Sequence, residues 1–150
     1  MERPSVYEYV GGERAFLALA AAHHRRCLVD PELAHPFEHH IEPDHVQRLA
    51  AYWAEVFGGP PRYSRDHGGH PAMLAVHAGE GMGEEYPQRF ARCFLEAADD
   101  AGFPPDADLR ALLRDYIESA TAEVESYAPP GSVPPADVPF PRWSWEGRRT

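Results

Sequence analysis

The sequence GGHPAMLAVHAGEGM, residues 68–82, places a histidine on a short segment with helical periodicity that lies between glycines. Pro71 is typical of the first turn of a helix, and Met73, Val76 and His77 stand at the i, i+3 and i+4 positions that share one face. The glycines that follow favour the end of a helix. The pattern therefore predicts a helix of about two turns whose apolar face carries an imidazole.

Four other segments carry apolar residues at helical spacing, and no segment alternates with period two. They predict helices over about 12–30, 43–57, 86–97 and 109–127, with a loop before the stretch quoted above. On the first of them, Phe16, Leu19, Ala20, Cys27 and Leu28 form an apolar face. His23 and His24 fill the missing turn of that face, so at least one of these imidazoles is expected to point inward. The fold class is all-α, a small helical sandwich.

The chain divides into a helical domain, residues 1–128, and a proline-rich tail, residues 129–150. A chain of 150 residues accommodates one domain with a core large enough to fold without disulfides. The tail is predicted to be extended. Phe140, Trp143 and Trp145 can anchor it to the domain or to a second subunit, and full disorder is the equally weighted alternative.

Charge and cysteine content limit which binding partners and which cellular location are expected. The formal net charge is −10 and all 14 basic residues are arginines, which excludes nucleic acid and an anionic membrane surface as expected partners. With no apolar run near 20 residues and no apolar core in the first ten, we expect a cytoplasmic protein. Cys27 and Cys93 lack CxxC or zinc spacing and are predicted to be reduced core residues.

All nine histidines precede residue 78. A histidine on a short, glycine-bounded helix that faces a histidine on another helix is the arrangement that a haem iron requires. One neutral imidazole binds the iron from below, and a distal pocket above it controls access of a gas ligand. The alternative interpretation is that His45 and His77 are ordinary, half-exposed helix residues.

Several short motifs fit together with these histidines. They are VGGE (10–13), DPEL (30–33), YW (52–53), GGP (58–60), YS (63–64), GHP (69–71) and HA (77–78). Over residues 7–127 the chain resembles the truncated haemoglobins, and within them group II, a type common in actinobacteria. The resemblance implies a truncated globin-like two-over-two helical sandwich that binds haem b (iron protoporphyrin IX).

The resemblance also assigns haem-binding residues. It implies that His77 is the proximal iron ligand, that Phe37 packs against the porphyrin, and that Leu49 and Trp53 follow the distal residue at one-turn intervals. The remaining expected haem contacts are Met73, on the face that carries His77, and Arg48 and Tyr63 as partners of the haem propionates. His70, beside Pro71, is expected to cap or orient the helix that carries the iron ligand.

The distal ligand pocket departs from the family's pattern. His24 stands where members carry a tyrosine, Phe90 where they carry a tryptophan, and His45 where they carry a small residue. The family's hydrogen bonds to the ligand therefore do not transfer to this chain. A neutral imidazole of His45 or His24 can donate one hydrogen bond to the gas, worth about 1–3 kcal/mol. Alternatively, His45 reaches the iron as a sixth ligand.

The expected function is binding of a diatomic gas, with oxygen, nitric oxide and carbon monoxide as candidate ligands. The sequence leaves open an oxygen-binding, NO-detoxifying (NO dioxygenase) or peroxide-linked (peroxidase-like) role, a reductase partner, and a monomer or homodimer. The competing hypotheses are a structural module and a haem-free protein that binds zinc or nickel. The metal ligands would then be His39, His40 and His45, or His70 and His77.

Overall fold

The computed structural model describes residues 3–34 and 43–149. Its helices are α1 (Val6–Val10), α2 (Glu13–Val29), α4 (His45–Val56), α5 (Arg62–Asp66), α6 (Gly69–His77), α7 (Tyr86–Asp100) and α8 (Ala107–Ser126). Phe37, His39 and His40 lie outside the described residues, so their expected roles stay predictions. The predicted all-α class is confirmed.

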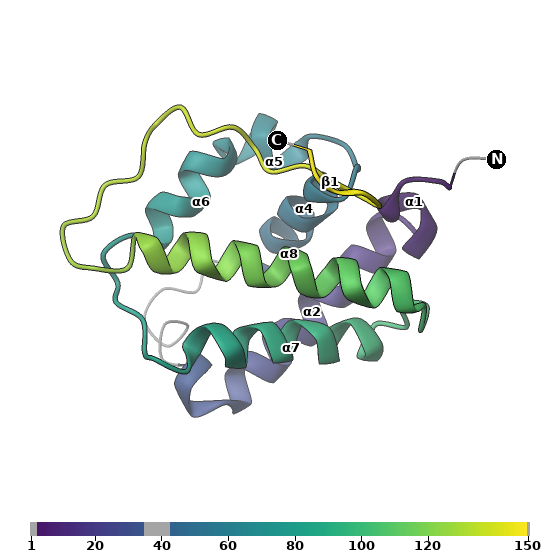
Figure 1. Ribbon diagram of the computed structural model, residues 1–150, viewed down its shortest axis with the longest axis horizontal. Coiled ribbons are helices and arrows are strands. Elements are labelled where there is room, and N and C mark those ends of the chain that lie inside the picture. Colours follow the sequence, from purple (N-terminus) through teal and green to yellow (C-terminus); the bar gives the residue numbers. More distant parts are fainter. Residues whose placement is uncertain (1–2, 35–42, 150) are drawn as a thin grey trace.

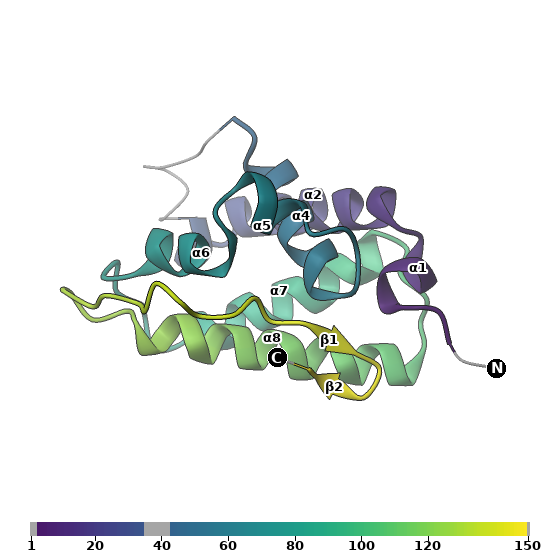
Figure 2. The same ribbon diagram turned by 90° about the horizontal axis from the view of Figure 1, so that it is seen from above.

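The four long helices form two layers. α2 and α4 pack together in one layer, and α7 and α8 lie side by side in the other, as Figures 1 and 2 show. Contacts between α2 and α7 join the layers. This is the predicted two-over-two sandwich, with the short helices α5 and α6 beside α4 at one end. Within the described part of the chain, no helix is both long and apolar enough to cross a membrane.

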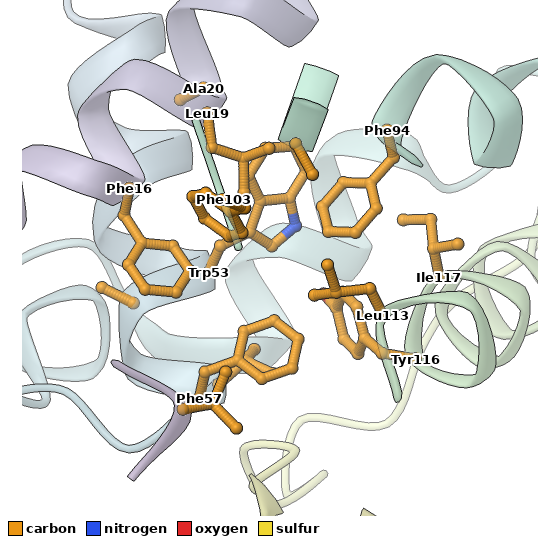
Figure 3. Packing of buried hydrophobic residues seen from close by; sticks show 14 of the residues in the cluster. Phe16, Leu19, Ala20, Trp53, Phe57, Phe94, Phe103, Leu113, Tyr116 and Ile117 are labelled. Atoms are coloured by element: carbon orange, nitrogen blue, oxygen red, sulfur yellow. The ribbon is translucent and has the colours of Figure 1, made fainter. Parts of the chain in front are cut away.

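Aromatic side chains from both layers meet in the core (Figure 3). Phe16 of α2 stacks against Phe57 at 6.0 Å between ring centroids, and Trp53 of α4 meets Phe94 of α7 edge to face at 4.8 Å. Tyr116 of α8 lies 5.0 Å from Phe57. All five are buried, and fully burying an aliphatic or aromatic side chain stabilises a fold by about 1.5–3 kcal/mol. The core therefore fixes α4 between α2 and α8.

Two predicted core positions are wrong. Leu28 is 46% exposed because it lies about 120° around α2 from Phe16, whereas Cys27 continues the Phe16 face. Val76 is 71% exposed because α6 buries its His70–Leu74 face, which lies about 120–160° around the helix from Val76. The helix α5 also forms where the sequence predicted only a loop, and α6 begins at Gly69, before Pro71.

The proline-rich tail is docked on the domain. It runs back along α8 and ends in a two-stranded hairpin, β1 (Trp143–Ser144) with β2 (Gly147–Arg148) (Figure 2). Phe140 lies 4.9 Å from the ring of Tyr52, and Trp143 meets Tyr116 at 5.6 Å. The Trp145 indole N–H donates to the Pro4 carbonyl at 2.8 Å. Of the two alternatives for the tail, the structure shows docking through the predicted aromatic residues.

Candidate functional site

His77 ends α6 with its ring held by its own helix. The ring Nδ1 lies 2.8 Å from the carbonyl oxygen of Met73. Since a carbonyl only accepts hydrogen bonds, Nδ1 carries the proton and the neutral ring presents its lone pair at Nε2. His77 is exposed, so a planar group can approach this nitrogen from outside the core. The side chain therefore has the tautomer and accessibility of a metal ligand.

Glycines fix both ends of α6. Gly68 and Gly69 enter the helix with φ of 89° and 72°, a region that side-chain-bearing residues rarely adopt, and a Cβ on Gly68 would meet Ala72 at 2.8 Å. After the helix the chain turns through Gly79, also at positive φ. Its N–H donates to the Tyr127 carbonyl at the end of α8 at 2.9 Å. The glycines on both sides of α6 therefore determine the position of His77.

Three further histidines gather on α2 and α4. The rings of His24 and His45 lie 5.1 Å apart, and His23, on the neighbouring position of α2, is buried at 1% exposure. A positive charge on either His24 or His45 would act on His23, and one on His77 would act on His45. The four imidazoles therefore form one electrostatic group across α2, α4 and α6.

The environment keeps the α2 and α4 imidazoles neutral. Burial, together with the smaller effects of the neighbouring His45 and His24, lowers the pKa of His23 to about 3. Burial also lowers the pKa of His24. The pKa of His45 falls through burial and then through His24 and His77, with Asp44 acting in the opposite direction. At neutral pH each of these rings offers one N–H donor and one lone pair.

Apolar and aromatic side chains surround this group. Phe90 and Trp53 contact the His23 ring, with centroids 4.6 and 5.2 Å away. Leu49 and Met73 are partly buried against the same core. Of the residues expected in the haem pocket, the structure thus brings Trp53 and Phe90 together at His23, and His24 together with His45.

Arg48 and Tyr63 lie elsewhere on α4 and α5. Arg48 donates to the Asp44 carboxylate at 2.9 Å on an exposed part of α4. Tyr63 is buried with its ring 5.1 Å from Tyr52, beneath Phe140 of the tail. Burial raises the pKa of the Tyr63 phenol, and the charge of Arg48 offsets part of this rise. Both side chains are near one another, and their expected role at the haem propionates stays a prediction.

A buried polar chain anchors α6 to the rest of the molecule. His70 Nε2 lies 2.8 Å from the Glu123 carboxylate of α8, and the Tyr52 hydroxyl of α4 lies 2.8 Å from His70 Nδ1. In the neutral ring, Nε2 donates to Glu123 and Nδ1 accepts from Tyr52. The sequence suggested an orienting role for His70, but Glu123 and Tyr52 as its partners were not predicted, because no local signal links residues 52, 70 and 123.

One cavity of the described residues lies beside α4 without including these histidines. It has a volume of about 240 Å³ and is lined by Tyr7, Phe16, Ala50, Ala54 and Arg62, among others, between α2, α4 and α5. None of the four histidines lines it. It carries no part of the site described here.

The haem-free metal hypothesis finds no support at the residues it named. In residues 3–34 and 43–149, the one group of three His, Cys, Asp or Glu donors close enough to hold a metal ion is His23, Cys27 and Cys93. His45, His70 and His77 do not belong to it. His39 and His40 lie outside the described residues.

Comparison with known proteins gives the family. The model of the bacterial-like globins matches residues 5–123. The haemoglobin of Chloroflexus aurantiacus is 30% identical, with 81% of this chain and 98% of that chain covered and a TM-score of 0.69. For the haemoglobin of Thermobifida fusca, an actinobacterium, the identity is 28%, the coverage 81% and 96%, and the TM-score 0.67. No match is found among curated proteins.

A more distant structure agrees on the fold. The group II 2-on-2 haemoglobin of Agrobacterium tumefaciens is 24% identical, covers 83% of this chain and 96% of its own, and has a TM-score of 0.69. The two-layer helix arrangement agrees with these matches. The chain therefore belongs to the bacterial-like globin family and has the two-over-two fold of the group II truncated haemoglobins.

Proposed function

We propose that this globin would hold haem b through His77 and bind oxygen, with His45 and His24 as the residues that would contact the gas. Membership of the globin family implies a haem cofactor and a diatomic gas ligand. The observation that supports His77 as the iron ligand is its hydrogen bond: Nδ1–H donates to the Met73 carbonyl, so Nε2 is the basic nitrogen. When bound, the haem supplies an iron with one coordination position for a gas.

His77 would hold and tune the cofactor. Its hydrogen bond to the Met73 carbonyl prevents ring rotation and raises the basicity of Nε2. Because the carbonyl belongs to the same helix, the ring needs no other segment to orient it. Trp53, Phe90, Leu49 and Met73, which all belong to or pack on the hydrophobic core, would supply apolar contacts to the cofactor. This donor set and its surroundings fit a haem.

His45 and His24 would recognise the gas. Both rings are kept neutral by burial, so each has one N–H to donate to a partly negative oxygen atom. Lowering of the His45 pKa by a charge on His77 or His24 strengthens this preference for the neutral form. Hydrogen-bond donors beside the gas favour oxygen over carbon monoxide, because the oxygen ligand carries more negative charge and gains more from a hydrogen bond.

A second candidate is peroxide-linked redox chemistry, which the close His24–His45 pair favours. With ring centroids 5.1 Å apart, one imidazole can accept a proton from a bound substrate while its neighbour stabilises the resulting charge. Loss of such an acid–base group typically lowers a rate by about 10²–10⁴-fold. Peroxide-dependent oxidation of a reducing dye should then fall by at least about tenfold in His45→Leu.

The test is gas binding by the haem-loaded protein. The full chain is loaded with hemin, reduced under argon, and mixed with oxygen or carbon monoxide while absorption is recorded. We expect one haem per chain and saturable spectral changes with both gases. His67→Ala, which changes a histidine outside the group, should behave as the native protein. Stoichiometric haem binding with no response to either gas would contradict the oxygen-binding proposal.

A further inference from the structure

Two cysteines and a histidine that are distant in sequence meet where α2 packs on α7. Cys27 Sγ lies 3.9 Å from Cys93 Sγ, and 3.6 and 3.7 Å from the two ring nitrogens of His23. All three side chains are buried, with 1%, 0% and 7% exposure for His23, Cys27 and Cys93. Their donor atoms all lie within 4.8 Å of one another. Both cysteines are free thiols.

These distances match those between ligands of one cation. Zinc binds thiolate sulfur at about 2.3 Å and imidazole nitrogen at about 2.0–2.1 Å, so in a tetrahedral site neighbouring sulfurs lie about 3.8 Å apart and sulfur and nitrogen about 3.5–3.6 Å apart. Two edges of the triangle are already close to these lengths. Cys27 stands four residues after His23, on the same helix face, so α2 presents both donors together.

Charge and polarity favour a thiophilic cation at this position. Leu33, Tyr86 and Phe90 pack with the two cysteines in an apolar cluster. Two thiolates and one neutral imidazole balance the two charges of a zinc ion, and a neutral complex avoids the cost of burying a net charge. Thiolate ligands select zinc or copper(I) over hard cations such as magnesium and calcium.

We propose that His23, Cys27 and Cys93 form a second metal site, separate from the haem, that binds zinc or another thiophilic cation. Three protein donors leave one position of a tetrahedral ion to a water molecule or another small ligand. The metal would join α2 to α7 by coordinate bonds. Because His23 also contacts Phe90 and neighbours His24, the ion would fix the side chains behind the distal pocket.

The experiment uses the full, haem-loaded chain, reduced and incubated with zinc sulfate and then freed of unbound metal. Elemental analysis gives zinc per chain, and X-ray absorption at the zinc edge gives the zinc ligands without interference from iron. We expect one zinc per chain with two sulfurs at about 2.3 Å and one histidine nitrogen at about 2.0–2.1 Å. Loss of a residue that only hydrogen-bonds to a metal ligand typically lowers metal affinity by about 10–100-fold. Loss of a ligand itself should cost more, so Cys93→Ala should weaken zinc binding at least about 100-fold.

His67→Ala is the matched control, since it removes a histidine outside the site, and it should keep the zinc. A zinc shell of only nitrogen and oxygen, or equal affinity in Cys93→Ala, would overturn the proposal. So would a reduced chain that takes up no zinc and forms a Cys27–Cys93 disulfide on oxidation. If Cys93→Ala does not fold, the zinc ligands seen in the X-ray absorption spectrum of the native chain decide whether the site exists. None of these outcomes depends on gas binding.

Discussion

At the scale of single residues, the site depends on where each histidine carries its proton. The Nδ1 of His77 lies 2.8 Å from the Met73 carbonyl oxygen, whereas burial lowers the pKa of His24 and of His45, and that of His45 is lowered further by His24 and His77. One ring is thus prepared to bind a metal and two are prepared to donate a hydrogen bond. Histidine can serve as a proposed metal ligand at one position and a proposed hydrogen-bond donor at two others because its surroundings differ on α2, α4 and α6.

Replacing His45 by leucine should remove the hydrogen bond to oxygen. If that bond contributes about 1–3 kcal/mol, oxygen should dissociate roughly 5- to 150-fold faster, with a smaller change for carbon monoxide. Stopped-flow displacement of oxygen measures this rate, with His67→Ala as control. An unchanged oxygen dissociation rate, together with faster association of both gases, would instead identify His45 as a sixth iron ligand.

At the scale of elements, the sequence predicted the long helices and missed the contacts between distant segments. The periodic apolar faces of α2, α4, α7 and α8 are local signals, and the structure confirms these helices. The short α5 lacks such a face, and the partners of His70 lie on α4 and α8. The approach of Cys27 to Cys93 likewise depends on packing between helices, so their spacing gave no sign of it.

Glu123 should stabilise the protein in a pH-dependent way. The hydrogen bond from His70 lowers the pKa of this carboxyl below its ordinary 4.5, so its stabilisation is present above pH 4.5 and lost as pH falls through the lowered pKa. Glu123→Gln should cost about 1.5–3 kcal/mol at pH 7. Denaturant unfolding at pH 7 and at pH 3 measures this, and the difference from native should shrink at pH 3. An equal difference at both pH values would contradict the assignment.

The docked tail should contribute to stability through its aromatic side chains. Trp143 packs edge to face on the buried Tyr116, at 5.6 Å. Truncating a fully buried tryptophan costs about 3–5 kcal/mol, and since Trp143 is half-buried, Trp143→Ala should cost about 1–3 kcal/mol. Val133→Ala, in the same tail but 84% exposed, should change stability by less than about 0.5 kcal/mol. Equal effects of the two substitutions in thermal unfolding would show that the tail does not depend on this contact.

At the scale of the whole molecule, two helix layers hold α6 at the edge of the core. α4 and α8 fix its first turn through Tyr52, Glu123 and His70, and the end of α8 holds the turn that follows it through Gly79. His77, the proposed iron ligand, therefore stands on a short helix that is secured at both ends. The overall fold was predictable from motifs spread over residues 7–127, because those motifs mark the turns and helix ends that this arrangement requires.

Haem uptake by His77→Gly, with and without added imidazole, tests the central claim most directly. The full chain and this variant are titrated with hemin, and absorption spectra are recorded in the ferric and ferrous states. We predict one haem per chain in the native protein, weak binding with an altered spectrum in His77→Gly, and recovery of the native spectrum when free imidazole occupies the space of the lost ring. A variant that binds haem as tightly as the native chain, with the same spectrum and no response to imidazole, would show that His77 is not the iron ligand.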